Sequence, residues 1–241
     1  MLLTIDIGNT SITIGVFKGN SLIKTYRIPT HTGNYETAFK KILGSKRARE
    51  AIICSVVPKS TPRVEKVLRK LLTKNAVVLV KNNTIPIKNC YRKPRQVGQD
   101  RLVNAYAAVK LYGAPAIIID FGTAITFDVV SKNKEYLGGM ILPGLEISLD
   151  ALAHKTALLP KIKLEKPQEF IGRDTKNSML SGIVYGVAAL TDDMVKRIKS
   201  KIGAHAKVIG TGGNITLIAS YCTQIDRIDK DLTLKGLHLL T

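Results

Sequence analysis

The chain has 241 residues and a formal net charge of +19, from 37 Lys and Arg against 18 Asp and Glu. Its hydrophobic fraction of 45% suffices for a real core, which excludes a disordered tail or a basic low-complexity arm. The length suits one large domain or two of ordinary size, and no apolar run approaches the length of a membrane span. We therefore expect a cytoplasmic protein that has no membrane partner.

The first half of the chain predicts an α/β domain. Compact apolar or alternating segments predict strands over residues 2–7, 12–17, 22–28, 50–57 and 76–80. Apolar residues at helical spacing predict helices over residues 35–43, 62–73 and 100–111. A basic loop containing Pro86 and Pro94 leads up to Gly98, just before the last of these helices.

At Ala114 the pattern restarts. Residues 116–123 repeat the opening order of apolar strand, Asp, apolar residue, Gly and hydroxyl residue, so that Asp120 corresponds to Asp6. Further strands are predicted over residues 124–130, 136–141 and 207–210, and helices over 145–153, 178–199 and 215–221. The economical explanation is an internal duplication. We expect two similar α/β domains, residues 1–113 and 114–241, facing each other across a cleft.

The positive charge is concentrated in one stretch of the first half. Residues 40–110 hold 18 Lys and Arg against 3 Asp and Glu, a balance of +15. Four basic residues of this stretch alternate with apolar ones, as on the solvated face of an amphipathic helix: Lys66, Arg69, Lys70 and Lys74. The chain has no Trp, no RNA-binding aromatic signature and no Cys/His finger, so we do not expect nucleic acid as a partner.

The cysteines indicate neither a disulfide framework nor a zinc site. They are odd in number, far apart and form no CxxC pair. We expect Cys54, Cys90 and Cys222 to be reduced and mostly buried thiols.

The repeated turn after each opening strand favours phosphate binding. Glycine lets the backbone approach a ligand, neighbouring N–H groups and hydroxyls can donate to phosphate oxygens, and an Asp at the strand end can hold Mg²⁺. Residues 211–214, Thr-Gly-Gly-Asn before a helix, fit the same purpose, although a plain strand-to-helix turn would have the same sequence. No P-loop motif is present.

Asp100 and Arg101 follow Gly98 at the start of a predicted helix. An Asp in this place can simply stabilise the helix N-terminus. It can also accept the proton of an alcohol during phosphoryl transfer, while an Arg beside it suits a carboxylate or an amide oxygen. Helix capping alone does not choose between these interpretations.

Four motifs together resemble the type III pantothenate kinases over almost the whole chain. They are Asp-Ile-Gly-Asn-Thr at 6–10, Gly-Gln-Asp-Arg at 98–101, Asp-Phe-Gly-Thr-Ala-Ile-Thr-Phe-Asp at 120–128 and Gly-Gly-Met-Ile-Leu-Pro-Gly at 138–144. The resemblance implies an α/β fold of duplicated ribonuclease H-like (actin-like ATPase) domains. It also implies transfer of the ATP γ-phosphoryl group to the 4′-hydroxyl of pantothenate, which opens coenzyme A synthesis. Members of this family are typically homodimers that need a divalent metal such as Mg²⁺ and a monovalent cation, K⁺ or NH₄⁺.

The same resemblance implies roles for individual residues. Asp100 would be the proton acceptor, Asp6 would lie near Mg²⁺, and Asp120 would bind the monovalent cation. The ATP-binding residues would be Asp6, Ile7, Gly8, Asn9, Thr10, Ser11, Ile12, Thr13 and Thr123. The pantothenate-binding residues would be Tyr91, Gly98, Gln99, Asp100, Arg101 and Thr175. Gln99 stands where the family commonly has Ala, and Arg173-Asp174 where it commonly has Lys-Asn.

Two alternatives to a pantothenate kinase stay open. One keeps the fold but phosphorylates another small alcohol. The other is a non-enzymatic regulator that binds nucleic acid through the basic stretch, although intact Asp6, Asp100 and Asp120 argue against a degenerate enzyme. The homodimer rests mainly on the resemblance, with some support from apolar helices that begin near Asp100 and Ser178.

Overall fold

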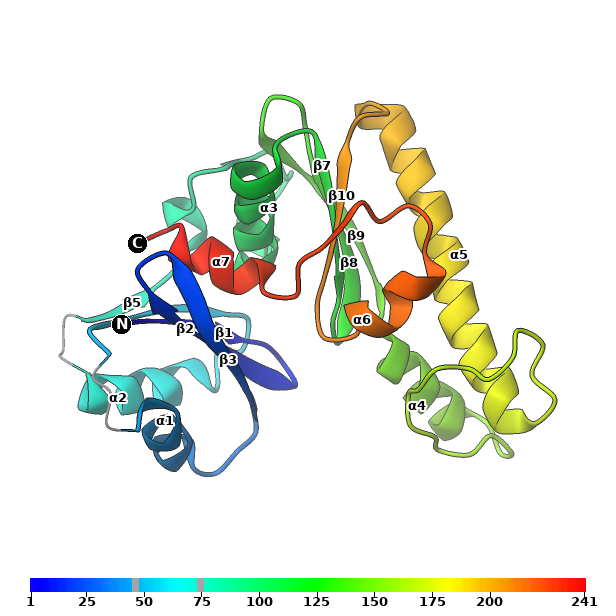
Figure 1. Ribbon diagram of the computed structural model, residues 1–241, viewed down its shortest axis with the longest axis horizontal. Helices are drawn as coiled ribbons and strands as arrows, with labels where there is room; N and C mark the ends of the chain where they lie inside the picture. The colour runs from blue at the N-terminus through cyan, green and yellow to red at the C-terminus, as the bar shows by residue number, and fades with distance from the viewer. Residues whose placement is uncertain (45–47, 73–75) are drawn as a thin grey trace. The chain divides into compact units, whose positions relative to one another are not determined.

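The computed structural model describes residues 1–44, 48–72 and 76–241, which divide into two compact units (Figure 1). Unit 1 comprises residues 1–87, 91–107 and 232–241, and unit 2 comprises residues 88–90 and 108–231. The sequence predicted a single boundary after residue 113. The difference lies chiefly in the C-terminal ten residues, which return to unit 1.

Unit 1 is built on a sheet with strand order β3-β2-β1-β4-β5, in which β1 pairs antiparallel with β2 and parallel with β4. Its strands are β1 Leu2–Ile7, β2 Ser11–Lys18, β3 Ser21–Pro29, β4 Glu50–Ser55 and β5 Val77–Leu79. Its helices are α1 Tyr35–Leu43, α2 Thr61–Leu71, the first part of α3 Gln99–Tyr112, α7 Leu232–His238 and the 3₁₀ turns Asn82–Thr84 and Pro94–Gln96.

Side-chain alternation along β1 and β2 gives this sheet two different faces. Leu3, Ile5 and Ile7 point to one face and are fully buried in a core that includes residues of α1 and α2. Thr4 and Asp6 point to the other face, on which α7 packs. Figure 1 shows α1 and α2 on one side of the sheet and α7 on the other. The second face therefore carries the polar end of β1.

Unit 2 contains a sheet with strand order β11-β10-β7-β8-β9-β6. Its strands are β6 Lys88–Asn89, β7 Ala116–Phe121, β8 Ala124–Val130, β9 Glu135–Pro143, β10 Lys207–Thr211 and β11 Arg227–Ile228. Its helices are α4 Leu145–Lys155, α5 Thr175–Ile202, α6 Ile215–Ile218 and the 3₁₀ turn Ala219–Tyr221. The long helix α5 covers one face of the sheet and buries Val184, Ala188 and Val195 against it (Figure 1).

The two sheets share one topology, which supports the predicted duplication. The order β3-β2-β1-β4-β5 of unit 1 corresponds to β9-β8-β7-β10-β11 of unit 2, with the same parallel and antiparallel pairings. The pairing of Asp6 with Thr13 across β1 and β2 recurs as Asp120 with Thr126 across β7 and β8.

Most predicted elements are found within a few residues of their expected bounds, and three differences are informative. Helix α5 begins at Thr175, three residues before the expected start, because Asp174 caps it: the Asn177 N–H donates to Asp174 Oδ1 at 2.8 Å. Helix α7 was not predicted, nor were the two-residue strands β6 and β11. Thr73, the predicted end of α2, lies outside the described residues.

The basic stretch forms a solvated helix face, as predicted. On α2, Val64 and Leu68 are buried while Lys66, Arg69 and Lys70 are exposed. Glu65 forms an ion pair with Arg69 at 2.6 Å, and Glu36 forms one with Lys70 at 3.7 Å. Lys74 falls outside the described residues.

Cys54 is buried and Cys222 half-buried, but Cys90 is exposed, so the expectation of buried thiols is wrong for that position. The strand β6 ends at Asn89, and the backbone of Cys90 stays at the sheet edge, where its N–H donates to the Tyr136 carbonyl at 2.9 Å. Among the described residues, no helix is both long and apolar enough to cross a membrane.

Candidate active site

A tight turn joins β1 to β2 and carries the first predicted phosphate-binding motif. The Gly8 N–H donates to the Ser11 carbonyl at 3.1 Å, which closes the turn around Asn9 and Thr10. Both of these residues are exposed, and Asp6 is half-buried at the end of β1. Exposed backbone and hydroxyl groups after a buried strand are what an anion-binding turn requires.

Thr30 holds this turn in place, a role that the sequence analysis missed. Its hydroxyl donates to the Gly8 carbonyl at 2.6 Å, and its N–H donates to the Thr10 carbonyl at 3.1 Å. The Tyr35 hydroxyl in turn donates to the Thr30 carbonyl. The pairing of β2 with β3 explains this contact. Pro29 lies opposite Ser11, so the next residue, Thr30, lies beside the turn.

Asp100 lies half-buried in the first turn of α3. Burial raises the pKa of its carboxyl above the ordinary Asp value, while the Arg101 N–H, which donates to Oδ1 at 2.9 Å, and the Arg101 charge act in the opposite direction. Gly98 lies against the same oxygen, because a Cβ atom at position 98 would collide with Asp100 Oδ1. The carboxylate is thus fixed in place and is a stronger base than an exposed Asp.

The buried thiol of Cys54 is affected by both candidate site carboxylates of unit 1, Asp6 and Asp100. Cys54 pairs with Asp6 in the register of β1 and β4, so both side chains point to the same face of the sheet. Burial raises the pKa of the Cys54 thiol well above its usual range, and the charges of Asp6 and Asp100 raise it further. The charges of both carboxylates therefore act on one buried thiol of unit 1.

The other predicted residues of this region differ in exposure. Arg101 is buried, with 8% of its surface exposed, whereas Gln99 and Tyr91 are half-buried. All three lie in unit 1 with Asp6 and Asp100.

The second predicted turn, Asp120 to Thr123, lies in unit 2 and is enclosed by two glycines. A Cβ atom on Gly212 would collide with Asp120 Oδ1, and Gly212 has a φ of +94° that favours glycine. A Cβ atom on Gly144 would collide with the Thr123 carbonyl. The Thr-Gly-Gly-Asn loop therefore does pack on the Asp120 turn, as expected for residues that serve one site.

A buried carboxylate stands behind this turn. Asp128 is fully buried and accepts the Tyr136 hydroxyl at 2.8 Å and the Thr126 hydroxyl at 3.0 Å. Thr126 pairs directly with Asp120, so the hydrogen bonds of Asp128 fix the strand beside the candidate cation ligand.

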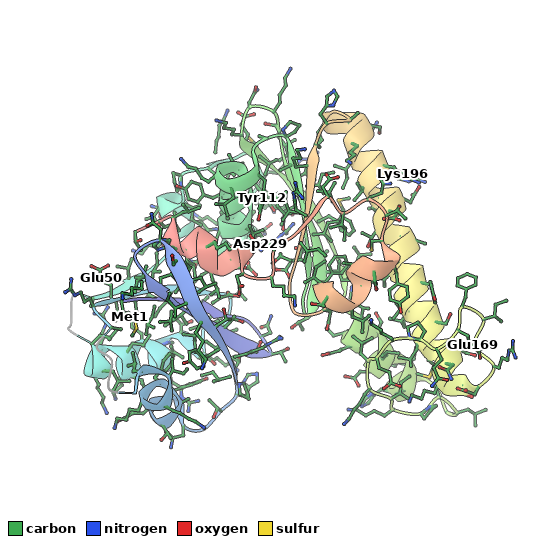
Figure 2. All side chains as sticks on the ribbon, viewed as in Figure 1. Met1, Glu50, Tyr112, Glu169, Lys196 and Asp229 are labelled. Atoms are coloured by element: carbon green, nitrogen blue, oxygen red, sulfur yellow. The ribbon has the colours of Figure 1, made fainter. Side chains whose placement is uncertain are left out.

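Thr175 is exposed at the start of α5 and lines a pocket of about 640 Å³ in unit 2. The pocket is walled by apolar side chains of α4, α5 and the loop between them, among them Leu152, Leu159 and Met179. Glu169, which Figure 2 labels in the loop before α5, accepts the Arg173 N–H at 3.1 Å. Arg173 and Asp174, the departures from the family pattern, thus stabilise the entry to this helix.

Among the described residues, no group of three or more His, Cys, Asp or Glu is arranged to hold a metal ion. A single carboxylate, Asp6, beside the hydroxyls of Ser11 and Thr13 fits Mg²⁺ that arrives with a polyphosphate, because Mg²⁺ keeps several waters and is usually held by one or two carboxylates plus substrate phosphates.

Most of the residues described above fall within the sequence profile of a known family. A sequence profile described as type III pantothenate kinase matches residues 2–197, which include both turns, Asp100 and Thr175. The chain belongs to the type III pantothenate kinase family.

Curated relatives named type III pantothenate kinase match over full length. The protein from Frankia alni is 40% identical, with 100% of this chain and 98% of the relative covered. The one from Finegoldia magna is 42% identical, with 100% and 96% covered.

Solved structures show the fold. A putative Baf family transcriptional activator from Campylobacter jejuni superposes with a TM-score of 0.59 at 20% identity, covering 99% of this chain and 95% of that one. The activator of 2-hydroxyisocaproyl-CoA dehydratase from Clostridium difficile, solved with bound ADPNP, gives 0.56 at 13% identity, covering 99% and 94%. The chain is therefore an ATP-dependent kinase with an actin-like fold, as the sequence predicted. Such a kinase binds ATP together with a divalent cation.

Proposed function

We propose that this protein transfers the γ-phosphoryl group of ATP to the 4′-hydroxyl of pantothenate, giving ADP and 4′-phosphopantothenate, the first step of coenzyme A synthesis. The observation that carries the proposal is Asp100. It is a half-buried carboxylate with a raised pKa, held by Gly98 and the Arg101 N–H, and it belongs to unit 1 together with Asp6. A base of raised pKa beside a phosphate-binding turn suits phosphoryl transfer to an alcohol.

In this mechanism Asp100 accepts the proton of the pantothenate hydroxyl as its oxygen attacks the γ-phosphorus. A bond forms between that oxygen and phosphorus, the bond from the γ-phosphorus to the β,γ-bridging oxygen breaks, and ADP leaves with the electron pair. Since phosphoryl transfer needs mostly positioning and charge neutralisation, a fixed carboxylate is sufficient as the base.

ATP phosphates would bind at residues 6–13, where the exposed Asn9 and Thr10 offer backbone N–H and side-chain donors, and at Thr123. Asp6 would hold Mg²⁺, which neutralises phosphate charge when bound. A monovalent cation, K⁺ or NH₄⁺, would bind at Asp120, whose carboxylate is fixed against Gly212.

Pantothenate would contact Tyr91, Gly98, Gln99 and Arg101 besides Asp100. Arg101 matches the pantothenate carboxylate in charge. Thr175, which lines the pocket of unit 2, would be a further pantothenate contact.

A homodimer is part of the proposal. The surface that supports it belongs to unit 2 and not to α3. Residues 101–108 of α3 are buried within the chain, so that helix has no spare apolar surface there, contrary to the sequence expectation. Unit 2 instead exposes Leu158, Phe170 and Ile171 at 91%, 68% and 76%. Contiguous exposed apolar patches mark association surfaces, and these three side chains would contribute to one in the proposed dimer.

A coupled ADP assay with and without pantothenate tests the proposal. We expect ADP formation that depends on pantothenate, requires Mg²⁺ and increases with K⁺. If the wild-type protein releases ADP no faster with pantothenate than without it, the proposed substrate is wrong. A panel of other small alcohols in the same assay then separates a different acceptor from a protein without kinase activity.

A further inference from the structure

A basic side chain lies beside the phosphate-binding turn and has no part in the mechanism above. The Nε of Arg27, on β3, donates to the hydroxyl of Ser11 at 2.7 Å. Ser11 is the first residue of β2, directly after the turn. The guanidinium group is therefore anchored at the turn by one nitrogen.

The register of the sheet explains how a residue of β3 reaches this place. Asp6 pairs with Thr13 across β1 and β2, and Thr13 pairs with Arg27 across β2 and β3. Residues directly opposite each other point to the same face, so these three side chains form a row across the sheet. The row lies on the face opposite the core that buries Ile12 and Ile14. Arg27 thus shares its face with the proposed Mg²⁺ ligand.

The charge of Arg27 has no counter-charge among the residues that the structure describes. Its side chain is exposed, and across residues 1–44, 48–72 and 76–241 no carboxylate forms an ion pair with it. Two exposed cations of α1 and α2 differ in this respect, since Lys40 pairs with Glu36 and Arg69 pairs with Glu65. With Nε bound to Ser11, both terminal nitrogens of Arg27 keep their donors for an anion.

We propose that Arg27 binds the polyphosphate of ATP beside the turn, with Ser11 orienting its guanidinium group. A guanidinium presents paired donors that match two phosphate oxygens and stays charged at every physiological pH. Its charge would stabilise the negative charge that redistributes over the phosphates during transfer. This inference rests on the proposed kinase function, because it requires ATP to bind at residues 6–13.

The test compares Arg27→Gln with Lys24→Gln, a control on the same strand that removes the same charge. Lys24 is exposed but lies over the Tyr26 ring, at 4.9 Å, on the opposite face of β3. The dissociation constants of ATP, ADP and adenosine are measured by calorimetry with Mg²⁺ on the full chain, together with kcat and KM for ATP. We expect Arg27→Gln to weaken the binding of ATP and ADP about tenfold or more, which is the effect of one charge-assisted contact. The binding of adenosine should weaken less than about twofold. Arg27→Lys should recover part of the loss, and Lys24→Gln should bind like wild type.

Equal weakening of ATP and adenosine by Arg27→Gln would mean a general change in the nucleotide site and would overturn the phosphate contact. The phosphate contact would also be overturned if Arg27→Gln bound ATP as tightly as a wild type that phosphorylates pantothenate. That outcome would leave the proposed function intact. The reverse result, no pantothenate-dependent ADP release but a selective loss of ATP and ADP affinity in Arg27→Gln, would support the phosphate contact and reject only the substrate.

Discussion

Gly98 packs against Asp100 so closely that the Oδ1 atom of the carboxylate occupies the space that a side chain at position 98 would need. Val56, just after β4, also borders that space, with its Cγ1 atom at 3.5 Å. A methyl group at position 98 therefore has nowhere to go unless Asp100 moves.

Gly98→Ala should accordingly reduce kcat about 100-fold while the protein stays folded, because a displacement of about 1 Å in a reacting group has an effect of that size. Steady-state kinetics with pantothenate and a melting curve measure both properties. Gly186→Ala on α5 is the matched control, since a Cβ atom there meets nothing within 4 Å. A Gly98→Ala enzyme with wild-type kcat would show that Asp100 is not held by this contact.

Asp100→Asn should abolish most activity and yet stabilise the fold. Loss of a general base costs about 10²–10⁴-fold in rate. The folded protein holds the Asp100 proton more tightly than the unfolded chain, because burial raises its pKa, so stability falls as pH rises from the ordinary Asp pKa through the raised one. At pH 7 the buried negative charge of Asp100 lowers the stability of the fold, and replacement by Asn removes this loss.

Melting temperatures of wild type and Asp100→Asn across the acidic range check this expectation. The variant should melt higher at pH 7, and its advantage should shrink as pH drops below the raised pKa. The kcat/KM of wild type should decline over that same acidic interval. A variant that melts lower than wild type at pH 7 contradicts the burial argument.

Much of the fold follows from local pattern, and the rest depends on contacts between distant residues. Helix α1 has the predicted bounds, and in the structure Asn34 caps its start while Gly44 ends it. Helix α7 was missed because its sequence is short and its burial comes from packing on β1 and against Val103. Similarly, the turn residues were read from their motif, whereas Cys54 became part of the site only through its register with Asp6. A buried thiol has no sequence signature that tells which residue it faces.

Thr30→Val should weaken ATP binding without altering the pantothenate contacts. Valine has nearly the same shape but cannot donate to the Gly8 carbonyl, so the turn loses the 2.6 Å bond that fixes it. We expect KM for ATP to rise about tenfold, with a loss of about 1 kcal/mol of stability from the unsatisfied carbonyl. Kinetics and melting curves test both, and Thr30→Ser, which keeps the hydroxyl, should resemble wild type. An equal rise of KM in Ser and Val variants would rule out the hydrogen bond as the cause.

Tyr112→Phe should destabilise unit 2 in a manner that changes with alkaline pH. The Tyr112 hydroxyl, at the end of α3, donates to Asp229 Oδ2 at 2.7 Å, and Figure 2 shows the two labelled side chains near each other. Burial, and then the bond to Asp229 and its charge, raise the pKa of Tyr112 to about 12. Removing the donor from the buried Asp229 should cost about 1 kcal/mol, or about 2–4 °C in Tm.

The raised pKa gives this prediction a second measurement. A tyrosine whose folded pKa exceeds its unfolded value contributes its full stability below about pH 10, and loses that contribution as pH rises toward 12. The gap in Tm between wild type and Tyr112→Phe should therefore be constant through neutral pH and close in strong alkali. The difference in phenolate absorbance between wild type and Tyr112→Phe reports the titration of Tyr112 alone. Its midpoint should lie near pH 12. A midpoint near pH 10 would mean that Asp229 does not hold the hydroxyl.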